Sequence, residues 1–157
     1  MEIIPKFEDI TEDCPSCVDY IEDMAPTHKG RYLGQKESYN LNEEAVRKLK
    51  ELIPDYEIVA VFADWCGDAR KAVPVLSLLE EELGIKIRAL GGMTKPPYGS
   101  KKHWAVPPSP IEVDTFNITS SPTIIIFNKN GDEVGRIKTR PKLTKTIEQE
   151  IVKIIEG

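Results

Sequence analysis

Apolar positions along the chain follow two different periods, which predict both strands and helices. A strand is predicted at residues 57–63, where positions 58–63 form a continuous apolar run typical of a strand buried on both faces, and residues 85–90 predict a second short strand. Between them, apolar side chains recur at helical spacing from residue 66 to residue 83, and Gly84 provides a stop signal. A strand–helix–strand unit of this kind predicts two parallel strands joined by a right-handed crossover.

The same patterning predicts three more elements around this unit. A helix should begin after Asn42, a favourable N-cap, and stop before Pro54. Strands at 122–128 and 133–138 flank an Asn-Gly pair, a strong signal for a hairpin. A final helix over 141–155 should bury one face, formed by Leu143, Ile147, Ile151 and Ile154.

The first forty residues lack a clear period. We expect them to be mostly irregular, with one short helix at 18–24 that is broken by residues 25–30. The predicted fold is α/β: a mixed central sheet, parallel in the middle with an antiparallel edge hairpin, flanked by helices. Residues 1–37 are interpreted as an N-terminal extension, and residues 38–157 as the main domain.

Length, charge and cysteine content disfavour several classes of function. A length of 157 residues suits one domain with a sizeable core. A net charge of −5 disfavours nucleic acid or an anionic membrane as the main partner, and no apolar run approaches the ~20 residues of a membrane-spanning helix. The N-terminus lacks a signal-peptide pattern, so a cytoplasmic location is expected. In a reducing compartment, three cysteines favour catalytic, redox or metal-binding roles over structural disulfides.

The most informative motif is Trp65-Cys66-Gly67-Asp68, where an apolar strand gives way to a helix. A thiol at a helix N-terminus faces unpaired backbone N–H groups, which favour the nucleophilic thiolate. The polar neighbours Asp64 and Asp68 favour exposure over the alternative of a passive, buried cysteine. A dithiol redox helix would carry a second cysteine three residues on, where this chain has an alanine.

The Trp-Cys-Gly-Asp motif, Pro74 within the long helix, and Ser121-Pro122-Thr123 before a strand together resemble the thioredoxin-like superfamily. With alanine at position 69, the chain is similar to a group whose Trp-Cys-Gly-Asp-Ala motif lacks the second cysteine. The resemblance implies a thioredoxin-like fold for about residues 38–157. It also implies thiol–disulfide oxidoreductase activity.

The resemblance also assigns roles to individual residues. Cys66 would be the attacking thiol, and Trp65 would shield one side of its sulfur. Pro122 would follow a cis peptide bond and place the backbone of Ser121 beside the sulfur. With their neighbours in the motif, the expected substrate-binding residues are Trp65, Gly67, Asp68, Ser121 and Pro122.

Two alanines depart from the family pattern. Ala69 replaces the resolving cysteine, and Ala60 stands where thioredoxins keep a buried carboxylate that serves that second thiol. The two losses are coherent, since a base for a missing thiol has no task. A dithiol cycle therefore cannot run at Cys66 alone.

A complete Cys-x-x-Cys motif lies upstream, at Cys14-Pro15-Ser16-Cys17. One interpretation is a redox pair that resolves a mixed disulfide on Cys66. A second is half of a zinc site, which would need further ligands from His28, His103, Cys66 or carboxylates. The third is two unlinked thiols. The sequence leaves all three open.

Residues 91–110 form a long loop, and loops of this length are usually functional or disordered. It leaves the second predicted strand at the sheet edge that carries Cys66. Its lysines, His103, Tyr98 and Trp104 suit a lid or docking loop for an acidic thiol or peptide, or else a solvated insertion. The acidic runs 80–82 and 148–150 are interpreted as solvated helix faces.

We therefore predict a thiol–disulfide oxidoreductase that acts through Cys66, with the mixed disulfide resolved by Cys14, Cys17 or an external thiol. Its partners would be protein disulfides or low-molecular-weight thiols, without nucleic acid or membrane, and it would use no cofactor. The alternative is a thioredoxin-like binding module without redox turnover, favoured by the alanines at positions 60 and 69.

Overall fold

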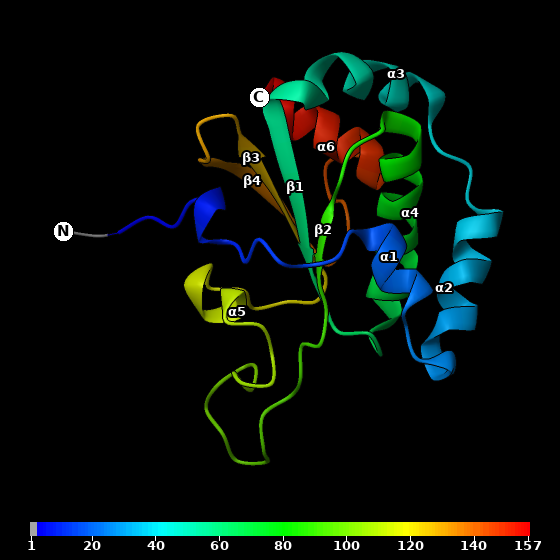
Figure 1. Ribbon diagram of the computed structural model, residues 1–157. Coiled ribbons are helices and arrows are strands. Elements are labelled where there is room, and N and C mark those ends of the chain that lie inside the picture. The colour runs from blue at the N-terminus through cyan, green and yellow to red at the C-terminus, as the bar shows by residue number, and fades with distance from the viewer. Residues whose placement is uncertain (1–2) are drawn as a thin grey trace.

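The computed structural model describes residues 3–157 and shows a twisted four-stranded sheet with helices packed against it (Figure 1). The strands are β1 (Tyr56–Val61), β2 (Arg88–Leu90), β3 (Thr123–Asn128) and β4 (Glu133–Lys138). The helices are α1 (Cys17–Glu22), α2 (Pro26–Ser38), α3 (Glu43–Leu52), α4 (Gly67–Leu83), α5 (Glu112–Thr115) and α6 (Ile147–Glu156), with 3₁₀ turns η1 (Phe7–Asp9) and η2 (Ile53–Asp55).

The mixed sheet is confirmed, in the order β2-β1-β3-β4. β1 and β2 are parallel, as the strand–helix–strand unit predicts, and β3 and β4 form the expected antiparallel hairpin. The prediction of a parallel middle was wrong, because the central pair β1–β3 is antiparallel. The chain leaves β2 and returns to β3 at the same end of the sheet, where the long loop and α5 lie (Figure 1), so β3 must run back against β1.

Side chains of β1 alternate between two separate cores, as the strand period of two requires. Ile58, Ala60 and Phe62 face the larger cluster, which α1, α2, α3, α4 and α6 cover. Val59, Val61 and Ala63 face the opposite cluster, closed by α5 and the N-terminal segment. Burial on both faces explains why positions 58–63 show no alternation of apolar and polar residues.

Helix boundaries follow local signals where those signals are strong. Asn42 caps α3 by accepting a hydrogen bond from the Ala45 N–H at 2.9 Å. Gly84 ends α4 with a left-handed φ of 66°, which glycine adopts without a Cβ clash. Pro74 lies inside α4, as predicted.

The short helix predicted at 18–24 is confirmed as α1, but the expectation that the rest of the first forty residues is mostly irregular was wrong. Residues 25–30, interpreted as a helix breaker, begin the thirteen-residue helix α2, with Pro26 at its first position. Proline is favoured there because the first helical N–H has no intrahelical partner. Both α1 and α2 pack against α4, so the extension covers the same helix that begins at Cys66.

The C-terminal helix is shorter than predicted. It begins at Ile147, after a capping box between Thr146 and Gln149, and Leu143 lies outside it with 70% of its surface exposed. The expected burial of Leu143 was therefore wrong, whereas Ile147 and Ile151 are buried.

The acidic runs are not simply solvated, because three of their glutamates are buried. Glu150 accepts hydrogen bonds from three successive backbone N–H groups before α6, those of residues 142–144. Glu148 accepts from the Asn42 N–H, and Glu80 accepts from the Cys17 N–H. These carboxylates satisfy backbone donors between distant segments, a role that helical periodicity does not encode.

Candidate functional site

Cys66 lies at the turn between the end of β1 and the start of α4. It is the N-cap residue of α4, with extended backbone angles, and its carbonyl accepts the Arg70 N–H at 3.1 Å. The side chain is only partly buried. Its position beside the unpaired N–H groups of the first helical turn is the one that the sequence predicts.

The Cys66 thiol points toward the segment before β3. Its Sγ donates a hydrogen bond to the Ser121 carbonyl oxygen at 3.3 Å. The Ser121 hydroxyl accepts the Ala63 N–H at 2.9 Å, which ties this segment to the end of β1. The Ser121–Pro122 peptide bond is cis, and Pro122 is buried. The fold thus brings together residues 55 positions apart around one sulfur atom.

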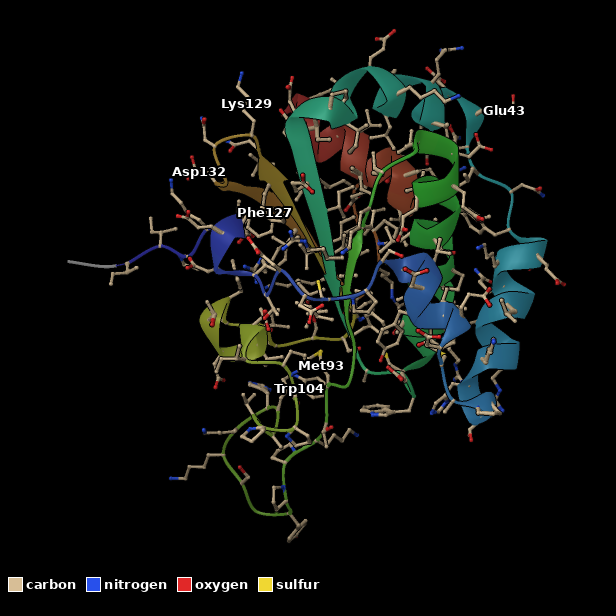
Figure 2. The ribbon with its side chains drawn as sticks, viewed as in Figure 1. Glu43, Met93, Trp104, Phe127, Lys129 and Asp132 are labelled. Atoms are coloured by element: carbon tan, nitrogen blue, oxygen red, sulfur yellow. The ribbon has the colours of Figure 1, made fainter. Side chains whose placement is uncertain are left out.

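Two aromatic rings and a lysine lie beside this turn. The Trp65 ring is 45% exposed, and its centroid lies 6.3 Å from that of Trp104 in the long loop. Lys95 Nζ lies 5.2 Å above the Trp65 ring, within cation–π range. Figure 2 shows Trp104 at the same end of the molecule as Met93, away from Lys129 and Asp132 on the β3–β4 hairpin.

The long loop is held in place by its own hydrogen bonds. The Ser109 hydroxyl accepts the Thr94 N–H, and the Thr94 carbonyl accepts the Ala105 N–H, each at 2.8 Å. Trp104 Nε1 is buried without a hydrogen-bond partner among the described residues. This loop therefore places an aromatic surface next to the Trp-Cys motif.

The N-terminal helices support the turn from the other side. The Tyr20 hydroxyl of α1 donates to the Asp64 carboxylate, and the Tyr32 hydroxyl of α2 donates to the Asp64 carbonyl at 2.9 Å. Burial, together with Asp64, raises the pKa of both tyrosines above the ordinary range, so both remain donors. Sequence reasoning missed these supports because they lie 44 and 32 positions from Asp64, with no local motif.

Asp68 and Gly67 face a groove between α2 and the first turns of α4. Asp68 pairs with Arg140 at 3.5 Å, and the groove has a volume of about 630 Å³. Its lining residues are Arg31, Gly34, Gln35, Ser38, Gly67, Asp68, Arg70 and Lys71. The groove is therefore rich in cations, although the chain as a whole is acidic.

The structure places Cys14 and Cys17 away from this turn, on a segment along the outer side of β2. The Ala89 N–H donates to the Pro15 carbonyl, and the Cys17 N–H donates to the Ile87 carbonyl, both at 2.9 Å. Cys14 belongs to one core and Cys17 to the other, so the two side chains face opposite sides of the sheet.

Both upstream thiols are buried in the reduced protein. Cys17 is 0% exposed, and burial followed by the nearby Glu80 carboxylate raises its pKa well above 9.0. Burial also raises the pKa of Cys14, with Arg88 opposing the shift. A raised pKa lowers the thiolate fraction, which opposes nucleophilic attack.

Within residues 3–157, no three His, Cys, Asp or Glu side chains are grouped so as to hold a metal ion. Cys14 and Cys17 face different cores, which does not suit two ligands of one tetrahedral zinc. His28 and His103 lie on different elements, in α2 and in the long loop.

Ala69 and Ala60 are both fully buried. Ala69 lies in the first turn of α4 and packs into the larger core, which also contains Ala60 on the central strand β1. The described structure thus has an apolar surface where a second thiol and its carboxylate would stand in the resembled pattern.

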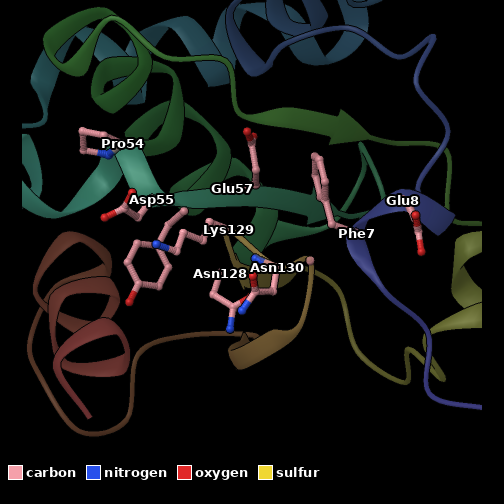
Figure 3. A pocket seen from close by; sticks show the side chains of 10 residues that line it. Phe7, Glu8, Pro54, Asp55, Glu57, Asn128, Lys129 and Asn130 are labelled. Carbon is pink, nitrogen blue, oxygen red and sulfur yellow. Dashed lines mark hydrogen bonds between the residues drawn. The ribbon is translucent and has the colours of Figure 1, made fainter.

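A separate groove lies at the opposite end of β1, lined by Phe7, Tyr56 and the β3–β4 turn among others (Figure 3). Its volume is about 430 Å³. It contains none of the predicted site residues, so we do not assign the chemistry to it. No helix within residues 3–157 is long and apolar enough to span a membrane.

Comparison with known proteins shows similarity to thioredoxins. A thioredoxin family model matches residues 14–91. Thioredoxin from Chlamydia muridarum is 33% identical over 93 residues, which cover 57% of this chain and 78% of that protein. Thioredoxin Y, chloroplastic, from Oryza sativa subsp. japonica is 26% identical over 128 residues, covering 80% of this chain and 66% of that protein.

Two solved structures share the fold. A protein of unknown function from Pseudomonas aeruginosa superposes with a TM-score of 0.72 at 12% identity, covering 98% of each chain. An HIV epitope scaffold superposes with a TM-score of 0.65 at 13% identity, covering 98% of this chain and 89% of the scaffold. At such identities the likeness shows the fold alone.

Proposed function

Since this chain belongs to the thioredoxin family, we propose that it is a thiol–disulfide oxidoreductase that works through the single thiol of Cys66. The observation that carries the proposal is the position of this thiol. Cys66 stands at the N-terminus of α4 with its Sγ against the Ser121 carbonyl, beside a cis Ser121–Pro122 bond. A partly exposed thiol at a helix N-terminus is placed to act as a nucleophile.

In the proposed first step, the Cys66 thiolate attacks one sulfur of a substrate disulfide. A new disulfide forms between Cys66 and that sulfur, and the other substrate sulfur leaves as a thiolate and takes up a proton. Cys66 gives up its thiol proton, so the Ser121 carbonyl loses the donor that it has in the reduced protein. That carbonyl then becomes free to accept a backbone N–H from the bound substrate.

Trp65, Gly67, Asp68, Ser121 and Pro122 surround this step as the substrate-binding residues. The exposed face of Trp65, extended by Trp104, offers an apolar surface beside the sulfur. Buried Pro122 holds the Ser121 backbone in place. Protein disulfides therefore suit the site, since an extended peptide can use both the carbonyl and the aromatic face.

We propose that an external thiol resolves the mixed disulfide. A thiolate from this reductant attacks the disulfide on Cys66, forms a disulfide with the departing group, and returns Cys66 to the reduced state. Cys14 and Cys17 are less suitable, because both are buried and burial raises the pKa of each thiol. Their pairing with β2 would have to break before either sulfur reached Cys66.

Reduction of insulin disulfides by an excess of a small thiol, with and without the protein, tests this proposal. We expect catalysis by the wild type, loss of catalysis in Cys66→Ser, and retained catalysis in the double variant Cys14→Ser/Cys17→Ser. Catalysis by Cys66→Ser would overturn the role of Cys66. Loss of catalysis in a folded double variant, together with a disulfide from Cys66 to Cys14 or Cys17 found by mass spectrometry in the oxidised wild type, would instead assign the resolving step to the upstream pair.

A second candidate is a binding module without redox turnover, favoured by the buried alanines at positions 60 and 69. Such a module would bind peptides at the Trp65 face while Cys66 forms no mixed disulfide. Incubation with a peptide disulfide followed by intact-mass measurement separates the two candidates. The three free thiols suit a reducing compartment, and we propose the cytoplasm.

A further inference from the structure

The groove between α2 and α4 opens directly beside Cys66, because Gly67, the next residue, forms part of its lining. Three cations line it: Arg31 from α2, and Arg70 and Lys71 from α4. We propose that this groove, the α2–α4 groove, binds the anionic part of a low-molecular-weight thiol that forms a mixed disulfide with Cys66. This inference rests on the proposed function, and it specifies that the external thiol in that function is anionic.

Arg70 connects the groove to the reacting sulfur. Its guanidinium folds back over the first turn of α4, with Nη2 3.4 Å from the point that a Cβ on Gly67 would occupy. The backbone N–H of Arg70 is bonded to the Cys66 carbonyl. A carboxylate held by Arg70 would therefore lie close to the Cys66 sulfur.

The other charges around the groove leave these cations available. Arg31, Arg70 and Lys71 have no ion-pair partner within residues 3–157. The lining contains one carboxylate, that of Asp68, and Arg140 pairs with it. The net field of the groove is thus positive, and it favours a ligand with free carboxylates.

The rigidity of the groove also favours a small ligand. The Gln35 side chain of α2 donates to the Lys71 carbonyl at 3.3 Å, and Lys36 pairs with Glu81 at 2.9 Å, so the two helices are tied together. The groove volume of about 630 Å³ lies in the range of small-molecule sites, about 300–1,000 Å³. It contains none of the aromatic residues that we assign to the peptide-binding face, Trp65 and Trp104.

This arrangement gives each half of a protein–small-thiol disulfide its own surface. The Cys66 thiolate attacks the sulfur of the small thiol, the protein sulfur leaves as a thiolate and is protonated, and a disulfide links Cys66 to the small thiol. A second molecule of the small thiol then attacks as a thiolate. It forms a symmetrical disulfide with the first and releases the Cys66 thiolate. In the net reaction the protein sulfur is reduced to a thiol, and the sulfur of the second molecule is oxidised to the disulfide level, so no further reductant is needed.

The test measures the rate at which Cys66 forms a mixed disulfide with two small disulfides, by intact-mass spectrometry. The probes are glutathione disulfide, which is anionic, and hydroxyethyl disulfide, which is neutral. The ratio of the two rates cancels any general change in the nucleophilicity of Cys66. We expect the ratio to fall about two- to five-fold in Arg31→Gln or Arg70→Gln, as for loss of one exposed ion pair, and further in the double variant.

Lys129→Gln is the matched control, since it removes one positive charge on the distant β3–β4 turn, and its ratio should equal that of the wild type. Added salt should lower the wild-type ratio toward that of the double variant. Equal ratios in wild type and in folded Arg31→Gln would overturn the groove assignment, while a mixed disulfide at Cys66 would still support the proposed function. No reaction of Cys66 with either probe would overturn both.

Discussion

The two cysteine-containing regions of the chain, at Cys66 and at Cys14–Cys17, differ in exposure and in position within the fold. Cys66 is the N-cap of the long helix α4, is partly exposed, and donates a hydrogen bond from its thiol to the Ser121 carbonyl oxygen. Cys14 and Cys17 lie beside β2, each buried in a different core. The cysteines that form the complete Cys-x-x-Cys motif are thus less accessible than the single Cys66.

The difference shows that spacing alone does not make a dithiol site. Two cysteines separated by two residues approach each other when they occupy the first turn of a helix. Here Cys14 precedes α1 in an extended segment, where side chains alternate between faces, and only Cys17 belongs to the helix. On this edge segment the motif therefore lacks the side-by-side arrangement of two thiols that a helix N-terminus would give it.

The largest expected difference between the two cysteine-containing regions is in the rate of thiol alkylation in the native protein. With iodoacetamide at mildly alkaline pH, we expect Cys66 to react at least ~100-fold faster than Cys14 or Cys17, because modification of buried thiols requires local opening. Peptide mass spectrometry over time measures the three rates. In concentrated guanidinium chloride the three rates should become similar. Comparable labelling of Cys14 in the native protein would contradict the contrast.

The second test asks whether the N-terminal region supports the Cys66 turn. A Cβ at Gly91 would lie 1.9 Å from the Tyr20 hydroxyl oxygen, so Gly91→Ala must displace Tyr20 from Asp64. We expect a loss of about 1–3 kcal/mol in the free energy of unfolding, measured in urea. Gly30→Ala, in α2 with no atom near its Cβ, should instead stabilise by about 0.5–1 kcal/mol. Equal stability of the two variants would exclude this support.

Alanine substitution compares the cysteines as packing residues. Cys17→Ala removes a fully buried sulfur and should cost about 1–2 kcal/mol of unfolding free energy. Cys66→Ala, at a partly exposed position, should cost less than about 0.5 kcal/mol while abolishing mixed-disulfide formation. Urea denaturation followed by circular dichroism measures both. The opposite order of stabilities would show that Cys66, rather than Cys17, is the structural thiol.

The smallest effect concerns pH. Burial raises the pKa of Cys17 well above 9.0, so above pH 9.0 the unfolded chain releases this proton while the folded chain retains it. The contribution of the neutral Cys17 thiol to the free energy of unfolding is therefore fully present below pH 9.0. It is lost as pH rises above 9.0, by at most about 1.4 kcal/mol per pH unit for one group. Cys17→Ala should flatten this decline, while the buried tyrosines contribute equally to both proteins. Parallel stability curves would contradict the burial of Cys17 as a neutral thiol.

Local sequence signals predicted most of the framework correctly. The helix caps at Asn42 and Gly84, the strand run at 57–63 and the Asn-Gly hairpin depend on neighbours within a few residues. The first position of α2 shows the limit of such signals, because Pro26 can either end one helix or begin the next. Packing of α2 against α4 selects the second option.

The long-range polar contacts, including those that support the Cys66 turn, could not be predicted in this way. Buried Glu80, Glu148 and Glu150 read as surface charges, since their partners are backbone N–H groups of other segments. Tyr20 and Tyr32 likewise reach Asp64 from distant helices. These contacts satisfy polar groups that the fold removes from water, and only the assembled fold defines which groups those are.

By itself, the sequence determined that Cys66 lies at a helix N-terminus, since a cysteine after a buried strand and before a helix lies beside the N–H groups of that helix. It also determined that an alanine, not a second cysteine, stands at position 69. Only the tertiary structure decided that Cys66 meets the Ser121 carbonyl, that Cys14 and Cys17 are buried on opposite faces, and that cations of α2 and α4 line one groove. The reason is that burial and long-range proximity are properties of how elements pack, and the periodicity of a single element does not contain them.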